Sequence, residues 1–529
     1  MTESPLPLPQ LPDPAVAWAQ TLEAWRVMFA PLAEAGRDRV KPNDKRFAAP
    51  EWEHPVFDLM RQGYNVMSDY LMGAVEAMPD DDPAQKAKMA FAMRTLVEAM
   101  SPANSPFTNP IALNKAVETK GQSLMAGMSH MIADMARGQL THTDPGAFEV
   151  GRNIAVTPGK VIKETPLYQL IHYAPTTPDV LAVPLVIFPP WINRFYILDL
   201  NPQKSFIAWA VAQGVSVFIV SWKSADASMK DVIWDDYILG GQIDAIDTVR
   251  ALLDVPAVHV IGYCVAGTTL AATLALLHAR AQADKVKSAT FFTAQVDFSA
   301  AGELLNFVDD AHIKMVEQLS SNGFLDGRVM ALTFNMLRGR DLIWNYVANN
   351  YLLGNDYPAF DLLHWNGDTT NLPAKWHRSY LQDLYRDNRL AMPGSIAVDG
   401  VPIDLRTVTT PSYIQAGRDD HIAPAESVWK IMDHFSGERL FVLAGSGHIA
   451  GVVNPPTSGK YQYWLSDATD SFASFIASAN ETKGSWWPHW IDWLRSHGDT
   501  MVPANGARQP GQGALPAIED APGRYAKMR

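Results

Sequence analysis

Cysteine is almost absent from this 529-residue chain, and Cys264 is the single one. Disulfides within the chain and cysteine metal clusters are therefore excluded. Positive charge is also scarce, because 43 lysines and arginines stand against 56 aspartates and glutamates, which gives a net charge of -13 at pH 7. Contacts with many phosphates need a basic face, so we expect no nucleic-acid partner.

Long apolar runs are missing as well. The longest one, residues 180–192, is interrupted by three prolines and is too short to cross a membrane. The first residues lack both the basic start and the apolar core of a signal peptide. No glycine-rich phosphate loop of the nucleotide-binding kind stands out. We therefore expect a cytoplasmic protein with no transmembrane segment, no metal and no bound cofactor.

Apolar residues at helical spacing dominate the N-terminal part of the chain. After a proline-rich start, this spacing predicts helices over residues 15–32, 57–78, 83–100 and 110–137, with no convincing strand between them. The stripe at residues 15–32 contains three aromatic side chains, and it either packs on a core or meets an apolar surface or partner. We expect an all-helical N-terminal domain over residues 1–165 with a flexible start.

Strand-like patterns begin near residue 167 and alternate with helical ones. Strands are expected at residues 168–173, 183–188, 215–221, 257–262 and 288–296, and again at 410–416 and 439–443. This βαβ order predicts the α/β class, with a mostly parallel, doubly wound sheet. We expect the catalytic core to comprise residues 166–299 and 407–529, including a C-terminal tail.

The sheet pattern is interrupted between residues 300 and 406 by a mainly helical insertion that is rich in tryptophan, tyrosine and asparagine. In doubly wound sheets, ligands bind outside the carboxyl ends of the strands. An insertion at this point of the chain lies above those ends. We therefore expect residues 300–406 to form a cap, or lid, over the site.

The segment at residues 257–267, AVHVIGYCVAG, is the centre of the predicted chemistry. It is typical of a strand, a sharp turn and a helix, and the turn resembles the nucleophile elbow of the α/β-hydrolase fold. Small flanking residues let the backbone bend tightly enough to raise one side chain above the sheet, and here that side chain is the Cys264 thiol. A lone cysteine is ordinarily a small buried residue, but this position predicts a nucleophile.

A thiol at an elbow needs a base, and the base needs a carboxylate that orients it; in this fold both follow the nucleophile along the chain. Asp419 and Asp420 follow the strand at 410–416, and the residues alone do not choose between them. His448 follows the next strand in a glycine-flanked loop and is the predicted base. Three other histidines lie beside or within regular elements, where structural roles are expected: His259, His421 and His434.

A tetrahedral oxyanion needs two backbone donors, normally the amide after the nucleophile and one from the loop after an earlier strand. The first of these is the amide of Val265. The strand at 183–188 is followed by two prolines, which have no N–H. The next amides belong to Trp191 and Ile192, and we expect Ile192 to be the second donor.

Several further motifs occur in one order along the chain: PPWIN (189–193), YILDL (196–200), WDDY (234–237), GYCV (262–265), WNY (344–346), WNGDTTNLP (365–373), DHI (420–422) and GSWWP (484–488). From about residue 150 onward, the chain thereby resembles the poly(3-hydroxyalkanoate) synthases, the polyester polymerases of bacterial storage granules. The triad of that family falls on Cys264, Asp420 and His448, which selects Asp420 over its neighbour. One departure is Ala266, where the family usually has glycine.

The resemblance implies that the protein polymerises (R)-3-hydroxyacyl-CoA into polyhydroxyalkanoate with release of CoA, through an acyl thioester on the cysteine. The long N-terminal region is similar to the class I forms, which act without a separate activating subunit. The resemblance also implies a homodimer that associates with polyester granules in the cytoplasm. CoA would then enter as part of the substrate and not as a cofactor.

Two other functions fit the same residues. A cysteine-dependent acyl-CoA thioesterase or acyltransferase of this fold would share the elbow, the acid and the base, and it would release a soluble product. A non-enzymatic granule-coat protein would bind the polymer through its aromatic N-terminal helices instead. The nature of the product tests the first function, and granule binding by an inactive Cys264 variant tests the second.

Overall fold

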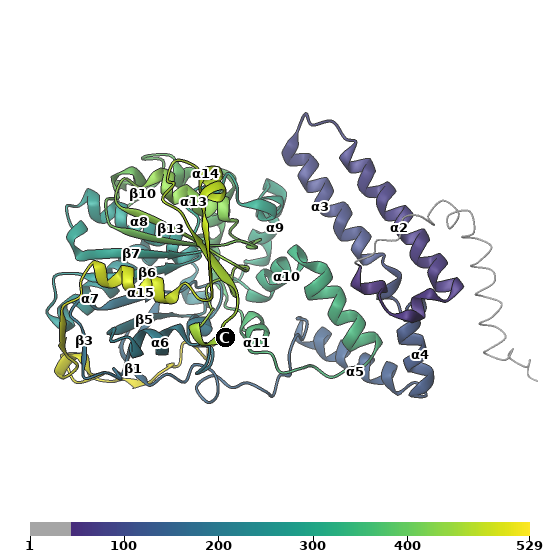
Figure 1. Ribbon diagram of the computed structural model, residues 1–529, viewed down its shortest axis with the longest axis horizontal. Coiled ribbons are helices and arrows are strands. Elements are labelled where there is room, and N and C mark those ends of the chain that lie inside the picture. Colours follow the sequence, from purple (N-terminus) through teal and green to yellow (C-terminus); the bar gives the residue numbers. More distant parts are fainter. Residues whose placement is uncertain (1–43, 529) are drawn as a thin grey trace, which may run out of the picture. The chain divides into compact units, whose positions relative to one another are not determined.

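The structure, a computed structural model, describes residues 44–528, which form two compact units (Figure 1). One unit comprises residues 44–140 together with Arg338–Tyr357, and the other comprises Thr141–Leu337 and the chain from Pro358 onward. The aromatic stripe predicted at residues 15–32 lies outside the described residues. No helix within residues 44–528 is long and apolar enough to cross a membrane.

The first unit is helical. Within its described residues, the α-helices are α2 (Pro55–Glu76), α3 (Pro83–Ala99), α4 (Pro110–Glu118) and α5 (Gln122–Arg137). The first three begin with proline, which has no N–H to leave unpaired at the first helical position. The preceding side chain caps the free amides, as where the Asn109 side chain accepts hydrogen bonds from the amides of Ile111 and Ala112. The proline and the capping side chain together fix where each of these helices begins.

The helix predicted over residues 110–137 is interrupted. Lys120 (φ 52°) and Gly121 (φ 85°) have left-handed backbone conformations and separate α4 from α5. Such residues cannot continue a right-handed helix. The prediction of a single helix is therefore wrong at this point, because the apolar spacing continues across the break.

Residues 338–357 pack in the first unit, although the sequence pattern groups them with the cap. They form two short helices, η9 (Arg340–Trp344) and η10 (Val347–Leu352). The chain at the end of η10 lies so close to α5 that a Cβ added at Gly127 would be 1.8 Å from the carbonyl oxygen of Tyr351. The Tyr351 hydroxyl also donates a 2.6 Å hydrogen bond to Asp134 of α5. The residues of the expected cap are thus divided between the two units. The N-terminal segment of the first unit ends at Leu140, whereas the predicted N-terminal domain extends to residue 165.

The second unit is built on one large sheet. In the part of the chain that the structure describes, this sheet has eleven strands in the spatial order β15 (Asn480–Lys483), β14 (Gln462–Leu465), β13 (Arg439–Ala444), β12 (Ser412–Gly417), β7 (Val286–Phe292), β6 (Val258–Tyr263), β4 (Leu185–Phe188), β5 (Val217–Trp222), β2 (Tyr168–Tyr173), β1 (Gly159–Glu164) and β17 (Glu519–Asp520). Neighbours from β13 to β5 are parallel, and the strands beyond them are antiparallel. The predicted mostly parallel, doubly wound sheet is confirmed.

The chain changes direction across the sheet between β4 and β6. It runs from β4 through α6 (Phe206–Ala212) to β5, and then returns through α7 (Asp244–Leu253) to β6 on the other side of β4. Strand β6 consequently lies between β4 and β7. Loops that leave the carboxyl ends of such strands diverge, and the opening between them is where α/β folds bind ligands.

Helices cover both faces of the sheet (Figure 1). On one face, α6 and α15 (Trp487–Ser496) share an aromatic core in which the Phe206 ring lies 5.1 Å from that of Trp487 and 5.0 Å from that of Trp490. The opposite face is covered by α7, α8 (Val265–Ala279) and α13 (Ala425–His434). The remaining helices of this unit are α9 (Asp310–Leu319), α10 (Gly327–Leu337), α11 (Asp361–Gly367), α12 (Ala374–Ser379) and α14 (Phe472–Ser478).

Short antiparallel pairs fasten the loops and the C-terminal tail. They are β8 (Phe324–Leu325) with β9 (Leu372–Pro373), β10 (Ala397–Val398) with β11 (Val401–Pro402), and β3 (Asp179–Leu181) with β16 (Met501–Pro503). The chain beyond β17 is held by Arg194, whose buried guanidinium donates hydrogen bonds to the carbonyl oxygens of Tyr525 and Met528. The tail predicted from the sequence is therefore packed on the second unit.

The bend from β6 into α8 requires a close contact between two glycines. A Cβ added at Gly262 would lie 2.6 Å from the Cα of Gly267, and a Cβ added at Gly267 would lie 2.5 Å from the Cβ of Ala294. Ala266 lies within α8, and its carbonyl oxygen accepts a 2.9 Å hydrogen bond from the side chain of Gln242. The methyl group at residue 266 is thus accommodated in ordinary helical backbone, whereas residues 262 and 267 leave no room for a side chain.

We expect Gly267→Ala to lower the free energy of unfolding by about 1–3 kcal/mol, because β6 and α8 would have to move apart. Gly240→Ala is the matched control, since Gly240 lies in the helical segment η6 (Asp236–Ile243) and a Cβ there meets no atom within 4 Å. Chemical denaturation followed by tryptophan fluorescence measures both variants. Equal stability of the two would contradict the close contact at Gly267.

Candidate active site

Cys264 occupies the bend between β6 and α8. Its backbone is left-handed, with φ 53° and ψ -126°, a conformation that residues with a side chain rarely adopt. The amide of Cys264 donates a 2.9 Å hydrogen bond to the carbonyl oxygen of Phe292, and its own carbonyl oxygen accepts from the amides of Gly267 and Thr268. These bonds hold the strained bend and leave the thiol half-buried above the sheet.

His448 and Asp420 are brought together by the loops that follow β13 and β12. The ring nitrogen Nδ1 of His448 donates a hydrogen bond of 2.7 Å to Oδ2 of Asp420, and both side chains are buried. The other carboxylate oxygen of Asp420 accepts hydrogen bonds from the amides of Ile422 (2.8 Å) and Ala423 (2.9 Å). The carboxylate is therefore fixed by its own loop before it meets the imidazole.

The backbones of the two loops are also joined. The amide of Arg418 donates to the carbonyl oxygen of Ala444, and the amide of Asp419 donates to that of Ser446. The hydroxyl of Tyr263, next to the elbow, donates a 3.1 Å hydrogen bond to the carbonyl oxygen of His448. Elbow, acid loop and histidine loop thus form one connected framework.

The charges around His448 raise its pKa. Burial by itself lowers the pKa of an imidazole, but the Asp420 carboxylate and the Cys264 sulfur, which also hydrogen-bonds the ring, outweigh burial and raise the pKa of His448 to about 10. The sulfur and the ring therefore interact. The arrangement of thiol, imidazole and carboxylate is suited to nucleophilic attack on an acyl group.

The other acid and base candidates lie elsewhere. The side chain of Asp419 is exposed, whereas that of its neighbour Asp420 contacts the imidazole. His259 is buried in β6, where its Nδ1 lies 2.7 Å from the hydroxyl of Ser288. His434 ends α13 and lies 3.5 Å from the carboxylate of Asp297.

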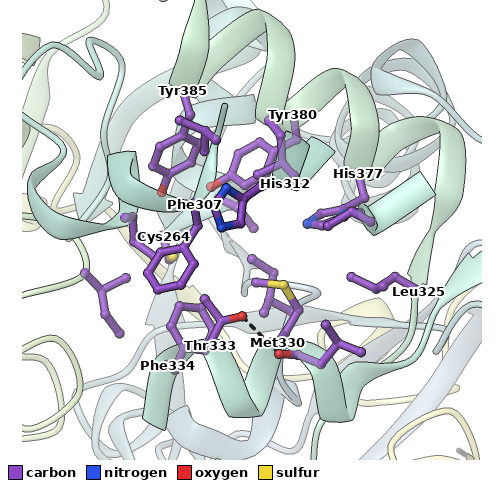
Figure 2. Close-up of a pocket in the computed structure, with 18 of the residues that line it drawn as sticks. Cys264, Phe307, His312, Leu325, Met330, Thr333, Phe334, His377, Tyr380 and Tyr385 are labelled. Carbon is purple, nitrogen blue, oxygen red and sulfur yellow. Dashed lines mark hydrogen bonds between the residues drawn. The ribbon is translucent and has the colours of Figure 1, made fainter. Parts of the chain in front are cut away.

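A cavity of about 100 Å³ adjoins the thiol (Figure 2). Part of its lining comes from the ends of the central strands and includes both predicted oxyanion donors, Val265 and Ile192. The facing wall comes from residues 304–334 and 377–385, which belong to the insertion after β7. No lysine, arginine, aspartate or glutamate of the described chain lines this cavity, and most of its side chains are apolar.

The loop that contains Ile192 is fixed by the insertion. The hydroxyl of Thr370 donates a hydrogen bond to the carbonyl oxygen of Trp191, and Asn193 pairs with Thr369 in an antiparallel bridge. The Trp191 ring is stacked on that of Tyr237, with centroids 4.0 Å apart. The sequence motifs at 189–193, 234–237 and 365–373 thus meet in one place.

Eight polar residues of the cavity were not predicted from the sequence: Thr268, Thr293, Gln295, His312, Thr333, His377, Tyr380 and Tyr385. The two tyrosines hydrogen-bond each other; burial raises the pKa of both hydroxyls, and the charge of the Cys264 sulfur raises it further. Thr293 has a left-handed backbone (φ 44°) and an unpartnered buried hydroxyl among the described residues. The only available signal was indirect, because Tyr380 and Tyr385 lie a few residues after the motif at 365–373.

The described residues contain no cluster of three or more histidine, cysteine, aspartate or glutamate side chains that could hold a metal ion. The residues around the thiol are those of acid–base and nucleophilic chemistry.

Two family models match this chain. Residues 43–210 match the family model described as the N-terminus of poly-beta-hydroxybutyrate polymerase (PhaC), and residues 184–455 match the alpha/beta hydrolase fold. Among solved structures, the 2-hydroxy-6-oxo-6-phenylhexa-2,4-dienoate hydrolase (BphD) from Rhodococcus sp. strain RHA1 has a TM-score of 0.32 at 11% identity, over 64% of this chain and 97% of that chain.

The relatives are similar over nearly the whole chain. The chain is 44% identical over 519 residues to the poly(3-hydroxyalkanoate) polymerase subunit PhaC of Rhizobium meliloti (strain 1021), which covers 97% of this chain and 83% of that protein. It is 44% identical over 524 residues to the poly(3-hydroxyalkanoate) polymerase of Methylorubrum extorquens, covering 97% and 85%. It is 40% identical over 518 residues to the polymerase subunit PhaC of Cupriavidus necator, covering 96% and 87%.

We expect the imidazole of His448 to titrate near pH 10, and at a lower pH in Cys264→Ala, because that variant loses one of the two groups that raise the pKa. NMR titration of histidine-labelled protein measures this pKa, and His448→Gln assigns the signal. The pKa of His448 in the folded protein lies above its unfolded value of about 6.5, so protonation of this ring stabilises the fold. This contribution to the free energy of unfolding is complete below pH 6.5 and is lost as the pH rises through 10. An unchanged pKa in Cys264→Ala would contradict the contact between sulfur and ring.

Proposed function

The chain belongs to the poly(3-hydroxyalkanoate) polymerase family, and from this membership we propose how it catalyses its reaction. The enzyme is an acyltransferase. We propose that it transfers (R)-3-hydroxyacyl units from CoA thioesters, through an acyl thioester on Cys264, to the hydroxyl end of a growing polyester. The contact of His448 with both Cys264 and Asp420 is the observation that best supports this proposal.

Because the pKa of His448 is about 10, its ring already holds the thiol proton at neutral pH, and the first half of the reaction begins from a thiolate–imidazolium pair. The sulfur attacks the thioester carbonyl carbon, and the carbonyl oxygen becomes an oxyanion that accepts hydrogen bonds from the amides of Val265 and Ile192. When the carbon–sulfur bond to CoA breaks, the CoA sulfur takes the proton from His448. Asp420 keeps the ring in the tautomer whose Nε2 faces the thiol.

In the second half, a hydroxyl of the growing chain, or of another hydroxyacyl unit, gives its proton to His448. Its oxygen attacks the acyl carbon on Cys264, an ester bond forms, and the thiolate leaves beside the protonated ring. A thioester on cysteine retains the activation of the CoA thioester until this hydroxyl arrives. An ester on serine would be no more reactive than the product.

Water competes with the hydroxyl for the acyl thioester and would release a free acid. The residues at 304–334 and 377–385, which face the elbow across the cavity, are mostly apolar and exclude water from it. We propose that this part of the insertion is the lid that the sequence predicts. We further propose that the enzyme works as a homodimer on the surface of polyester granules, as implied by its family.

We expect Cys264→Ala to release no CoA from (R)-3-hydroxybutyryl-CoA and to form no polymer, because no sulfur is present to accept the acyl group. The assay follows free thiol and turbidity together, so that CoA release without turbidity would identify a thioesterase. Cys264→Ser is the matched control, since it retains the geometry and loses the thioester. Polymer formed by Cys264→Ala would refute the proposed nucleophile.

We expect Asp420→Asn to reduce the rate of CoA release by about a hundredfold or more, because the amide no longer stabilises the imidazolium or sets its tautomer. Asp419→Asn should retain nearly full activity, since that side chain is exposed in the same loop. A second pair, His448→Gln and His421→Gln, tests the base in the same assay. Equal losses within either pair would remove the basis for choosing Asp420 and His448.

A further inference from the structure

His377 is a buried imidazole in the cavity next to the thiol. It lies in α12, is only 2% exposed, and lines the same cavity as Cys264. Figure 2 shows its ring reaching into the cavity on the side opposite Cys264. Among the described residues, neither Nδ1 nor Nε2 of His377 has a hydrogen-bond partner. Leaving such a buried polar group unpaired is costly, so the position calls for an explanation.

Most other polar side chains of the cavity are already paired. The hydroxyl of Thr268 donates to the carbonyl oxygen of Gln295, and that of Thr333 donates to the carbonyl oxygen of Val329. The side-chain amide of Gln295 donates to Ser427. The Nδ1 of His312 lies 2.8 Å from a carboxylate oxygen of Asp309. Among the fully buried polar atoms of the cavity residues in the described chain, those without a partner are the two ring nitrogens of His377 and the hydroxyl of Thr293. His377 therefore offers two buried, unpartnered nitrogens to a bound molecule at its end of the cavity.

The position of His377 is fixed by its aromatic neighbours. The ring of Trp376 is stacked on that of Tyr380, with centroids 5.0 Å apart, and meets the ring of Trp191 edge to face at 5.1 Å. Trp191 precedes the proposed oxyanion donor Ile192 in the chain. The helix that holds His377 is thus packed against the loop beside the reacting carbonyl, which is the preorganisation that a specificity site requires.

The chemistry around His377 indicates what it can bind. Burial lowers the pKa of His377 to about 4, so the ring is neutral at physiological pH, with one N–H donor and one acceptor nitrogen. A neutral ring in a cavity without charged side chains does not suit the phosphates of CoA. It suits an uncharged oxygen, either a hydroxyl or an ester carbonyl, on an otherwise apolar chain.

We propose that His377 is a specificity-determining residue that hydrogen-bonds an oxygen atom of the hydroxyacyl chain in this cavity. The oxygen is the 3-hydroxyl of the bound unit or the ester carbonyl of the unit before it. A hydrocarbon chain of the same length would fill the cavity but leave the imidazole unpaired, and the enzyme would thereby discriminate against it. This inference depends on the proposed function, because it assigns the acyl chain to the cavity beside Cys264.

The test compares acylation by (R)-3-hydroxybutyryl-CoA and by butyryl-CoA, read as the initial burst of CoA release. We expect His377→Phe, which keeps a ring and removes both nitrogens, to lower the preference for the hydroxylated substrate by about five- to tenfold. His377→Gln restores a donor and an acceptor and should recover part of that preference. Met330→Leu, an apolar substitution in the same cavity, should change both rates by the same factor.

A second pair of substrates distinguishes the two oxygen atoms. The CoA thioester of a 3-hydroxybutyrate dimer is compared with an unbranched hydrocarbon acyl-CoA of the same chain length. A loss of preference in His377→Phe for this pair alone identifies the ester carbonyl, and a loss for the monomer pair identifies the 3-hydroxyl. Unchanged preferences for both pairs, or equal slowing of all four substrates, would overturn the proposal.

The inference and the proposed function can fail separately. If the native enzyme gives no burst, or if Cys264→Ala still gives one, the proposed function fails whatever His377 does. The role of His377 is then tested by binding alone. Calorimetry measures the affinities of the same substrates for Cys264→Ala and for Cys264→Ala/His377→Phe, and the two variants are compared. A preference for oxygenated chains that is unaffected by the second substitution would refute the role of His377. Thermal unfolding of each variant shows whether the fold is retained.

Discussion

The left-handed backbone at Cys264 is the constraint on which the proposed chemistry depends. A residue with a side chain adopts this conformation only when its surroundings hold it there. Here the amide is held by the end of β7, the carbonyl oxygen by the first turn of α8, and the contact between Gly262 and Gly267 keeps strand and helix together. If the bend relaxed, the sulfur would no longer lie between the imidazole and the cavity.

The charged groups of the site lie around His448, whereas the cavity beside Cys264 is lined by uncharged side chains. On one side, Asp420 and the sulfur raise the pKa of His448 in spite of burial. On the other side, the cavity has no charged side chain in the described chain, and burial lowers the pKa of His377. The pKa values of these two buried histidines thus shift in opposite directions, because His448 has a carboxylate partner and His377 has none. Their environments suit proton transfer at His448 and recognition of a neutral group at His377.

The parallel core could be predicted because its strand-like segments alternate with helical ones, and β4, LVIF, is a continuous apolar run of the buried type. The edge strands could not, since β15 has four exposed residues, NETK, and β17 has only two residues. The elbow and His448 were predicted from local spacing and chain order, whereas the choice between Asp419 and Asp420 came only from the family resemblance. Local spacing cannot make that choice, because it depends on which side chain of the loop faces the imidazole.

The cavity residues from the insertion were the hardest to foresee. His377 and Tyr380 lie next to ordinary apolar and aromatic residues of a helix, and nothing in the local pattern distinguishes them. Their proximity to Cys264 arises from tertiary packing through Trp376 and Trp191, which joins segments nearly 190 residues apart. The helix break at Lys120 and Gly121 escaped prediction for a similar reason, since apolar periodicity continued through it.

Residues 338–357 belong to the first unit, although in the sequence they lie between two segments of the second unit. The polypeptide leaves the second unit at the end of α10, contributes η9 and η10 to the first unit, and then returns. Neither unit is therefore a continuous stretch of polypeptide, and a truncated protein that begins near Thr141 would contain η10 without the helix α5 on which it packs. Removing the N-terminal helices would therefore expose the face of η10 that packs on α5, within the insertion of the polymerase core.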